Sequence, residues 1–195
     1  MAEVKTSFYS EEELAEIGFK SYGTNVLISR YARFYHPERI CIGNHVRIDD
    51  FCIFSAGSNI VIGDYIHIAC YASMIGEGEI ILDDYCSISG RVSIYSSSDD
   101  YTGLAMTNPT IPSEYTYVKS APVHLCKNSI VGCGTVILPG VTLYEGASVG
   151  ALSLVNKDCE PESVYSGNPA KKMSKRLQRY HKIELRFEEW RKEND

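Results

Sequence analysis

The stretch IVGCGTVILPGVTLYEGASVGALSLV, residues 130–155, decides the fold because its aliphatic residues recur at an unusual interval. The positions at this interval, each six residues after the last, are Val131, Ile137, Leu143, Val149 and Val155. An α-helix repeats about every 3.6 residues and a β-strand every two, so neither element alone produces this spacing. A chain with this period has to turn a corner once per repeat, which indicates a solenoid.

The same step continues upstream in pairs that recur every 20 residues, namely Ile42 and Ile48, Ile62 and Ile68, and Leu82 and Ile88. Two residues before these positions lie small or apolar residues, and alternation along a strand turns both to the same side. They are Val46, Cys52, Ile66, Ala72, Cys86, Val92, Ser129, Thr135, Val141, Ala147 and Ser153. Each hexad therefore predicts a short strand plus a corner, and three hexads close a triangular coil.

The hexads IGNHVR, IGDYIH and VGCGTV share the pattern aliphatic-Gly-x-x-small-x. This pattern resembles the hexapeptide repeat of left-handed parallel β-helix proteins and covers about residues 40–160. The resemblance implies an all-β fold, a triangular prism with a short N-terminal helical cap, one extruded loop and a C-terminal α-helix. A fold alone does not identify an activity.

Residues 1–38 are expected to cap the solenoid, and residues 39–160 to form it. Within the cap, SEEEL predicts a capping box with Ser10 as the N-cap and Glu13 three residues later, followed by a short helix through about Phe19.

The tail, residues 161–195, predicts an amphipathic helix over 170–194. Its apolar residues are Met173, Leu177, Tyr180, Phe187 and Trp190. We expect this stripe to be covered by the prism or by a neighbouring subunit.

Composition excludes several classes of protein. The chain has a net charge of −6, which argues against a nucleic-acid partner. No segment approaches the roughly 18 apolar residues of a membrane-spanning helix, and the N-terminus lacks the apolar core of a secretory signal, so we expect a cytoplasmic protein without membrane insertion. The seven cysteines form no CxxC pair, which favours free, mostly buried thiols.

The repeat stops over residues 96–121, which contain SSSDDYTG, several prolines and several tyrosines. Loops of this length inside compact domains are usually functional. The loop and the later segment GNPAK, residues 167–171, resemble hexapeptide-repeat acyltransferases, including the sugar O- and N-acetyltransferases. The resemblance implies a homotrimer in which the loop of one subunit reaches a cleft between neighbours, with acetyl-CoA or another short acyl-CoA as co-substrate and no metal.

By the same resemblance, residues near the end of the prism would bind coenzyme A. Small residues would face the pantetheine arm, and basic ones would meet the phosphates as charge-assisted donors. The implied residues are Gly132, Gly134, Ala151, Ser153, Lys157, Pro169, Lys171, Lys172 and Arg176.

The loop lacks the histidine that many sugar and antibiotic acetyltransferases of this type carry as general base; Asp99 stands at that position. A sugar hydroxyl needs a base with a pKa near neutrality, whereas an aspartate near about 4 suits an amine, which is already nucleophilic when neutral. SDDY also resembles the acidic pair of the subgroup that N-acylates nucleotide-linked amino sugars. Asp99 and Asp100 would hold the amine and accept its proton, with Ser89 nearby. The acceptor would then belong to surface polysaccharide or lipopolysaccharide assembly.

Three alternatives remain open at this point. His67 faces outward and is another candidate base or hydrogen-bond donor to the thioester. The acceptor could also be a sugar hydroxyl, as in a sugar O-acetyltransferase. A prism-shaped metal enzyme would need three converging histidines, and only His45 and His67 lie about one coil apart. A non-catalytic trimeric scaffold would leave the acidic loop without a purpose.

Overall fold

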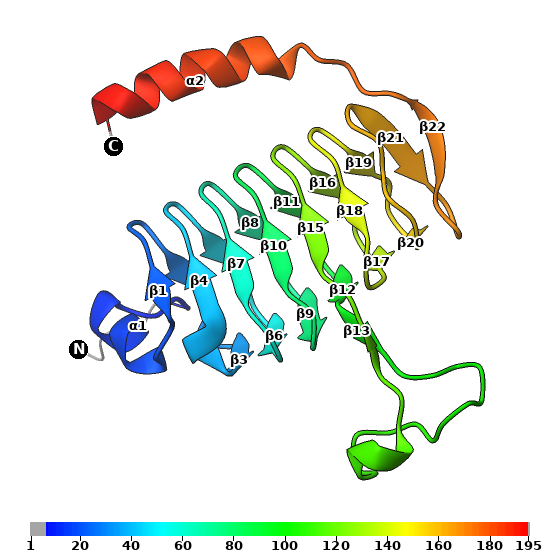
Figure 1. Cartoon of the computed structure of the whole chain (residues 1–195). Helices are drawn as coiled ribbons and strands as arrows, with labels where there is room; N and C mark the ends of the chain where they lie inside the picture. The colour runs from blue at the N-terminus through cyan, green and yellow to red at the C-terminus, as the bar shows by residue number, and fades with distance from the viewer. Residues whose placement is uncertain (1–6, 195) are drawn as a thin grey trace.

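Residues 7–194, which the computed structural model describes, form a three-sided parallel β-solenoid of stacked coils (Figure 1). The first side contains β1 (Ser21–Tyr22), β4 (Ile40–Ile42), β7 (Ile60–Ile62), β10 (Ile80–Leu82), β15 (Val123–Leu125) and β18 (Thr142–Leu143). The second side contains β2 (Leu27–Ile28), β5 (Arg47–Ile48), β8 (His67–Ile68), β11 (Ser87–Ile88), β16 (Ile130–Val131), β19 (Ser148–Val149), β21 (Ser163–Ser166) and β22 (Lys171–Lys175). The third side contains β3 (Arg33–Tyr35), β6 (Ile53–Ala56), β9 (Ser73–Gly76), β12 (Ser93–Tyr95), β17 (Val136–Ile137) and β20 (Leu154–Val155).

The interior is an aliphatic ladder, as the hexads predict. Equivalent residues of adjacent coils pair in parallel, for example Ile42 with Ile62 and Ile62 with Leu82. All the inward positions predicted from the repeat are buried, including the small residues two places earlier. Burial of each such aliphatic side chain contributes roughly 1.5–3 kcal/mol, so the ladder is the main source of stability.

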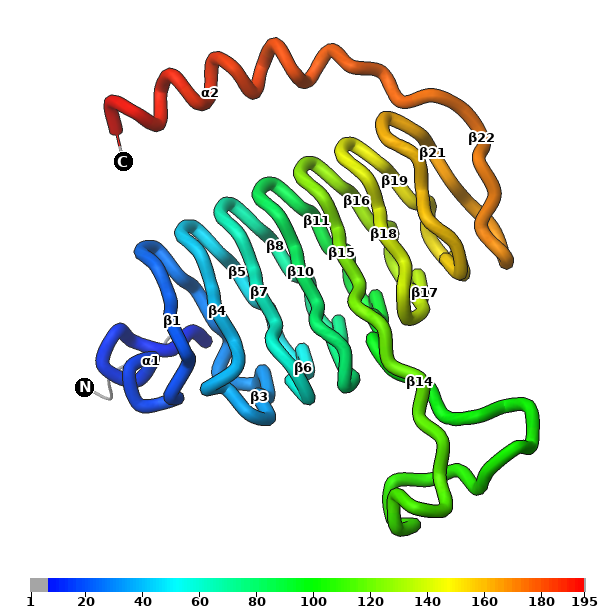
Figure 2. The backbone as a smooth tube through the Cα atoms, in the orientation of Figure 1, coloured from blue at the N-terminus to red at the C-terminus, as the bar shows by residue number. Residues whose placement is uncertain are grey.

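The three edges of the prism carry different features. The helix edge, between the first and second sides, contains the turns at His45, Tyr65 and Tyr85. The serine edge, between the second and third sides, contains Ser89 and the equivalent turn residues of the other coils. The loop edge, between the third and first sides, is where residues 96–121 leave the prism (Figure 2).

Side-chain oxygens tie the coils together along the helix edge. The backbone N–H of Asn44 donates to Asp64 Oδ1 (2.7 Å), and the N–H of Asp64 donates to Asp84 Oδ1 (2.7 Å). A Cβ at Gly63 would lie 2.6 Å from Asp84 Oδ1, which explains the glycine at that position. This row of hydrogen bonds along the helix edge links the same coils that the aliphatic side chains link inside the prism.

The N-terminal cap is shorter than the sequence predicts. The capping box is confirmed: Ser10 Oγ accepts from Glu13 N (3.3 Å), and Ser10 N donates to Glu13 Oε2 (2.8 Å) at the start of α1 (Glu11–Ile17). However, Ser21 already pairs with Cys41, so the first coil begins inside the segment assigned to the cap. The 3₁₀ turn η1 (Pro37–Arg39) then leads into the second coil.

The extruded loop has an ordered base. β13 (Ser97–Ser98) pairs in antiparallel fashion with β14 (Lys119–Ser120), and η2 (Ser113–Tyr115) forms one turn near the tip. Both views show the loop projecting away from the prism (Figures 1 and 2). The prediction of an extruded loop is therefore confirmed.

The C-terminal tail is not one continuous helix. Residues 171–175 form β22, which pairs with β21, and the helix α2 (Tyr180–Asn194) begins ten residues later than expected. Met173 and Leu177 consequently lie outside the helix and are exposed, and Trp190 is half exposed. The extended conformation is explained by the edge of β21, whose backbone groups β22 satisfies.

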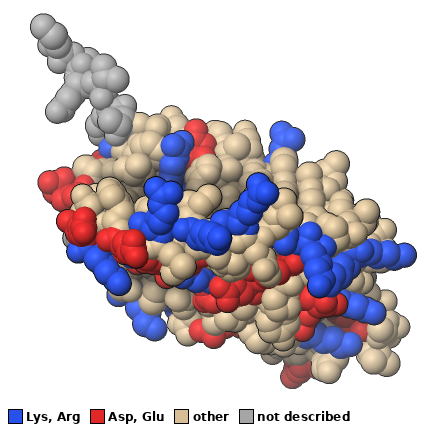
Figure 3. Space-filling view, turned by 90° about the horizontal axis from the view of Figure 1, so that it is seen from above, with Lys and Arg blue, Asp and Glu red and all other residues tan. Residues whose placement is uncertain are grey.

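α2 returns along the helix edge, held mainly by polar contacts (Figure 1). Arg191 pairs with Asp64 (3.0 Å), Lys127 pairs with Glu184 (2.6 Å), and the Phe187 ring packs edge-on against Tyr65 (5.0 Å between centroids). From above, basic and acidic side chains alternate over this surface (Figure 3). No helix within residues 7–194 has the length and apolar character needed to cross a membrane.

Candidate active site

Ser89 and His67 lie close to one another at the serine edge. His67 in β8 pairs with Ser87 in β11, and Ser89 follows two residues later, where the chain turns into β12. Alternation therefore directs the side chains of Ser87 and Ser89 to the same outer surface. Ser89 N donates to Val131 O (3.0 Å), which fixes the backbone at the turn.

His67 is held by a carboxylate from the preceding coil. Its Nε2 lies 2.8 Å from Asp49 Oδ2, and Asp49 Oδ1 accepts from Arg47 Nε (2.7 Å). Partial burial acts to raise the pKa of Asp49, but the hydrogen bonds from His67 and Arg47 outweigh it and lower that pKa below its usual value. Asp49 is thus an ionised partner that orients the imidazole.

The two loop carboxylates have different environments. Asp99 directly follows β13, is half-buried, and its carboxylate has no hydrogen bond or ion pair within the part of the chain that the structure describes. Its backbone carbonyl accepts from Ser98 Oγ (3.1 Å). Asp99 can therefore turn its carboxylate toward a bound substrate without breaking an internal contact.

Asp100 is engaged within its own loop, and this arrangement argues against the catalytic role expected for it. Its Oδ1 accepts from Thr102 Oγ1 (2.6 Å) and Thr102 N (3.0 Å), and its Oδ2 accepts from Leu104 N (2.6 Å) and Ala105 N (3.2 Å). These hydrogen bonds hold the pKa of the Asp100 carboxyl well below its usual range, and those from Thr102 have the largest effect. A carboxylate so fully used fixes the first turn of the loop and is a poor proton acceptor.

Ser89 and Asp99 of one chain lie at different edges of the prism. β12 crosses the third side between them, from the serine edge to the loop edge. At about 3.3 Å per residue, the chain from Ser89 to the end of β12 covers most of that side. Within one chain, Ser89 and Asp99 are therefore separated by most of the width of the third side.

Several residues implied in coenzyme A binding follow Ser89 along the serine edge. Gly132 and Gly134 flank the turn in the next coil, and Ala151 lies in the turn after that, with Gly132 N donating to Val149 O (2.8 Å). The turn with Pro169 and the start of β22 at Lys171 continue the line at the end of the prism. The edge between Ser89 and Lys171 thus carries mostly small side chains.

The remaining residues of that set lie elsewhere or are already engaged. Ser153 is buried, with its Oγ donating to Gly150 O (2.7 Å), so its side chain cannot face a ligand. Arg176 donates to the carbonyls of Asn128 (2.7 Å) and Gly146 (2.9 Å) at the helix edge, which ties down the tail. Lys157 is exposed beyond β20, at the loop edge.

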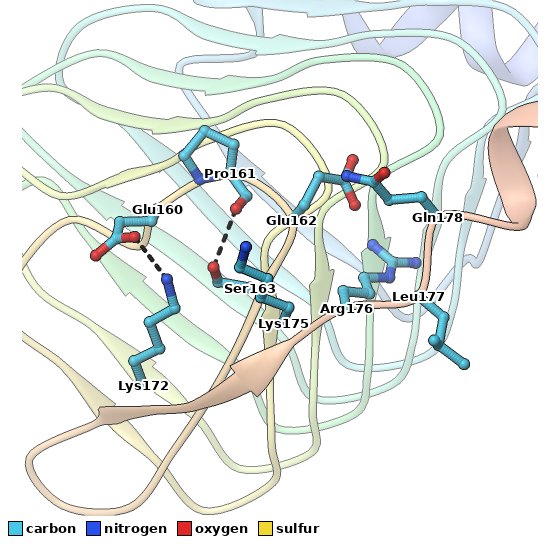
Figure 4. A pocket seen from close by; sticks show the side chains of 9 residues that line it. All are labelled: Glu160, Pro161, Glu162, Ser163, Lys172, Lys175, Arg176, Leu177 and Gln178. Atoms are coloured by element: carbon cyan, nitrogen blue, oxygen red, sulfur yellow. Dashed lines mark hydrogen bonds and ion pairs between the residues drawn. The ribbon is translucent and has the colours of Figure 1, made fainter.

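Lys172 lines a surface cavity of about 500 Å³ at the end of the prism (Figure 4). Its Nζ pairs with Glu160 (2.6 Å), while Lys175 and Arg176 follow Lys172 along the same segment and line the cavity farther on. The mixed charge of this cavity distinguishes it from the small-residue line of the serine edge.

Asp49 and Thr102 were not among the residues expected at the site. Asp49 stands 40 residues before Ser89, two coils away at the same position of the hexad, so the 20-residue repeat contained the signal. Thr102 follows Asp100 by two residues, the spacing of an Asx turn, which predicts a carboxylate that caps its own loop.

The histidines do not form the three-imidazole site of a metal enzyme. His45 stacks on Tyr65 (4.3 Å between centroids) at the helix edge, whereas His67 binds Asp49 on the second side. The cysteines are free, as expected, but only Cys52, Cys86 and Cys159 are fully buried, and Cys70 and Cys133 are exposed.

Comparison with known proteins gives close relatives over nearly the whole chain. A dTDP-4-amino-4,6-dideoxy-D-glucose acyltransferase of Escherichia coli is 52% identical over 182 residues, which cover 93% of this chain and 95% of the relative. No protein-family model matches the chain.

Solved structures of N-acyltransferases are also similar to this chain. AntD, an N-acyltransferase from Bacillus cereus, in complex with dTDP and 3-hydroxybutyryl-CoA, superposes with a TM-score of 0.90 at 43% identity, over 98% of this chain and all of AntD. A variant of AntD was solved with dTDP-4-amino-4,6-dideoxyglucose and coenzyme A (TM-score 0.91, 43% identity, 94% of this chain and 98% of AntD). The polySia-specific acetyltransferase NeuO, at 15% identity and a TM-score of 0.61 over 86% of this chain and 94% of NeuO, shares the fold.

Asp100→Asn tests the role of this carboxylate in the loop. An amide accepts from Thr102 but turns an NH₂ group toward the N–H of Leu104 or Ala105, so we expect these two amides to exchange hydrogen about tenfold faster or more. Because the folded-state pKa of Asp100 is depressed, the wild-type protection factor should stay constant above about pH 4, the ordinary value, and fall only as pH drops through the lower pKa. Hydrogen exchange followed by mass spectrometry measures both effects.

Asp99→Asn is the matched control, because its side chain makes no contact that the substitution would break, and protection should not change. Unaltered protection of Leu104 and Ala105 in Asp100→Asn would contradict the structural role.

Proposed function

Because the chain belongs to the nucleotide-amino-sugar N-acyltransferase family, we propose that it acylates the 4-amino group of dTDP-4-amino-4,6-dideoxyglucose. It is an acyl-CoA-dependent acyltransferase, and acetyl-CoA or another short acyl-CoA is the donor. The choice of an amine rests on Asp99, whose carboxylate has no hydrogen bond or ion pair with the described residues 7–194. It stands at the position where a hydroxyl-acylating enzyme would need a base of near-neutral pKa.

The reaction is a direct transfer. The neutral amine attacks the thioester carbonyl, a C–N bond forms, and the C–S bond breaks when the tetrahedral intermediate collapses. The nitrogen loses one proton, which Asp99 accepts, and coenzyme A leaves as a thiolate that is protonated to the thiol. A carboxylate suffices because the nitrogen becomes strongly acidic once it has attacked.

Two further groups support the transfer. Ser89 at the serine edge can hydrogen-bond the substrate. His67, whose Nε2 is held by Asp49, would donate to the developing oxyanion through Nδ1 as an imidazolium. The AntD variants studied as complexes change an aspartate and a serine ten positions before it, and Ser89 and Asp99 have the same separation here. The match supports a shared role for this pair.

The active site would lie between chains. Since Ser89 and Asp99 of one chain occupy different edges, we assign Ser89 and His67 of one subunit to the same site as Asp99 of its neighbour, in a homotrimer. The loop that carries Asp99 projects away from its own prism, as such an exchange requires. Exposed Trp190 and Ile183 on α2 give the assembly additional apolar surface to cover.

Acyl-CoA would lie along the serine edge. Gly132, Gly134 and Ala151 leave room for the pantetheine arm beside the turns, and Lys171 at the end of the edge would meet a phosphate. Lys157 and Lys172 are both exposed and would add positive charge at the same end of the prism.

We further place the enzyme in the cytoplasm, where acyl-CoA and sugar nucleotides are made. An N-acylated sugar nucleotide is a donor for glycosyl transfer, so the product would enter a surface polysaccharide such as lipopolysaccharide.

The choice of acceptor is tested with paired substrates. With acetyl-CoA, we expect turnover of dTDP-4-amino-4,6-dideoxyglucose and at least about 1000-fold less of the dTDP sugar that carries a hydroxyl at the same carbon, because no group with a near-neutral pKa deprotonates it. Release of the coenzyme A thiol and the product mass measure this. Equal rates on the two sugars would exclude the amine-specific mechanism.

Asp99→Asn tests the proton acceptor. We expect kcat/KM to fall by about 100-fold to 10,000-fold, with coenzyme A binding unchanged, because proton removal is lost while the cofactor edge is intact. His67→Asn is the comparison, and its loss should be smaller, since it removes one oxyanion donor. A large loss of activity in His67→Asn together with normal activity in Asp99→Asn would contradict Asp99 as the proton acceptor and favour His67 as the base.

A further inference from the structure

A carboxylate, an imidazole and a thiol converge on the first side of the prism, next to the helix edge. His124 in β15 pairs with Ile81 in β10, and Asp83 N donates to Leu125 O (2.9 Å), which places Asp83 beside Cys126 in the adjacent coil. Parallel pairing therefore brings together residues 41 positions apart in the sequence. His124 lies within β15, and Asp83 and Cys126 directly follow β10 and β15, so the paired strands hold the backbone of all three groups in place.

We propose that Asp83, His124 and Cys126 bind a zinc ion. His124 Nε2 lies 2.9 Å from Asp83 Oδ2 and 4.0 Å from Cys126 Sγ, and the three donor atoms are all within 4.8 Å of one another. Around tetrahedral zinc, such N···O and N···S pairs lie roughly 3.4 and 3.6 Å apart, so each distance has to change by about half an ångström. Small side-chain rotations supply that change.

The local charge favours a cation. Asp83 and Glu145 place negative charge near the Cys126 sulfur. The ammonium of Lys127, the residue after Cys126, pairs with Glu184 (2.6 Å) and Glu188 (3.6 Å) on α2. The centre of the three donors therefore has no competing positive charge from its sequence neighbour.

The donor set selects among metals. One thiolate and one imidazole favour zinc over magnesium or calcium, which bind oxygen ligands. Binding replaces the thiol proton of Cys126, which passes to the solvent, and water completes the fourth position. The three groups are half-buried, so an ion has access to them.

The chain contains an internal comparison for this site. His67 and Asp49 form a similar imidazole–carboxylate pair (2.8 Å), but among residues 7–194 no thiol joins them in a group of three converging donors. If a thiol is needed for tight binding, only the His124 site should hold zinc.

The test uses full-length protein freed of metal with a chelator and titrated with CoCl₂. We expect a single equivalent of cobalt with a thiolate-to-cobalt charge-transfer band, which ZnCl₂ then displaces. Cys126→Ser should abolish the band, and His124→Asn and Asp83→Asn should each weaken zinc binding by at least about tenfold. Circular dichroism checks that every variant is folded.

Two variants serve as controls. Cys133→Ser removes an exposed thiol away from the cluster, and His67→Asn removes the imidazole of the comparison pair; both should bind cobalt like the wild type. Absence of the band in wild-type protein, its persistence in folded Cys126→Ser, or its loss in Cys133→Ser would overturn the proposal.

Discussion

The stacking of aliphatic side chains in register, coil upon coil, is the constraint on which the rest of this structure depends. Ile62 pairs with Leu82 and with Ile42, and a polar side chain buried in this interior is costly unless it is hydrogen-bonded. Buried Ser153 and Thr135 comply, because both hydroxyls donate to Gly150 O. Chemistry is thereby confined to the outer faces and the edges of the prism.

The same constraint keeps Ser89 and Asp99 of one chain apart. A side of the prism is spanned by one short strand, so residues at the two ends of β12 cannot approach each other while the ladder persists. Ser89 belongs to the turn before this strand and Asp99 to the loop after it. A rigid solenoid therefore keeps Ser89 and Asp99 of one chain apart, and the proposed pairing of neighbouring subunits would bring them together.

The sequence was sufficient for the repeat, the inward residues and the extruded loop, because each depends on local period or on its interruption. It did not distinguish the surroundings of Asp99 from those of Asp100, since these differ by the hydrogen bonds that Asp100 accepts from Thr102 and its neighbours. Nor did it predict the contacts of Arg176, whose guanidinium donates to backbone carbonyls of other coils. Such contacts join distant segments, and no periodic pattern encodes them.

Mixed assemblies of Ser89→Ala and Asp99→Asn test the shared site most directly. If one subunit supplies Ser89 and its neighbour Asp99, random mixing of the two impaired variants in a cyclic trimer should restore about a quarter of the sites, and activity should recover accordingly. If both residues act from the same chain, every site remains defective. Activity of the mixture no greater than the mean of the two variants alone would contradict the account.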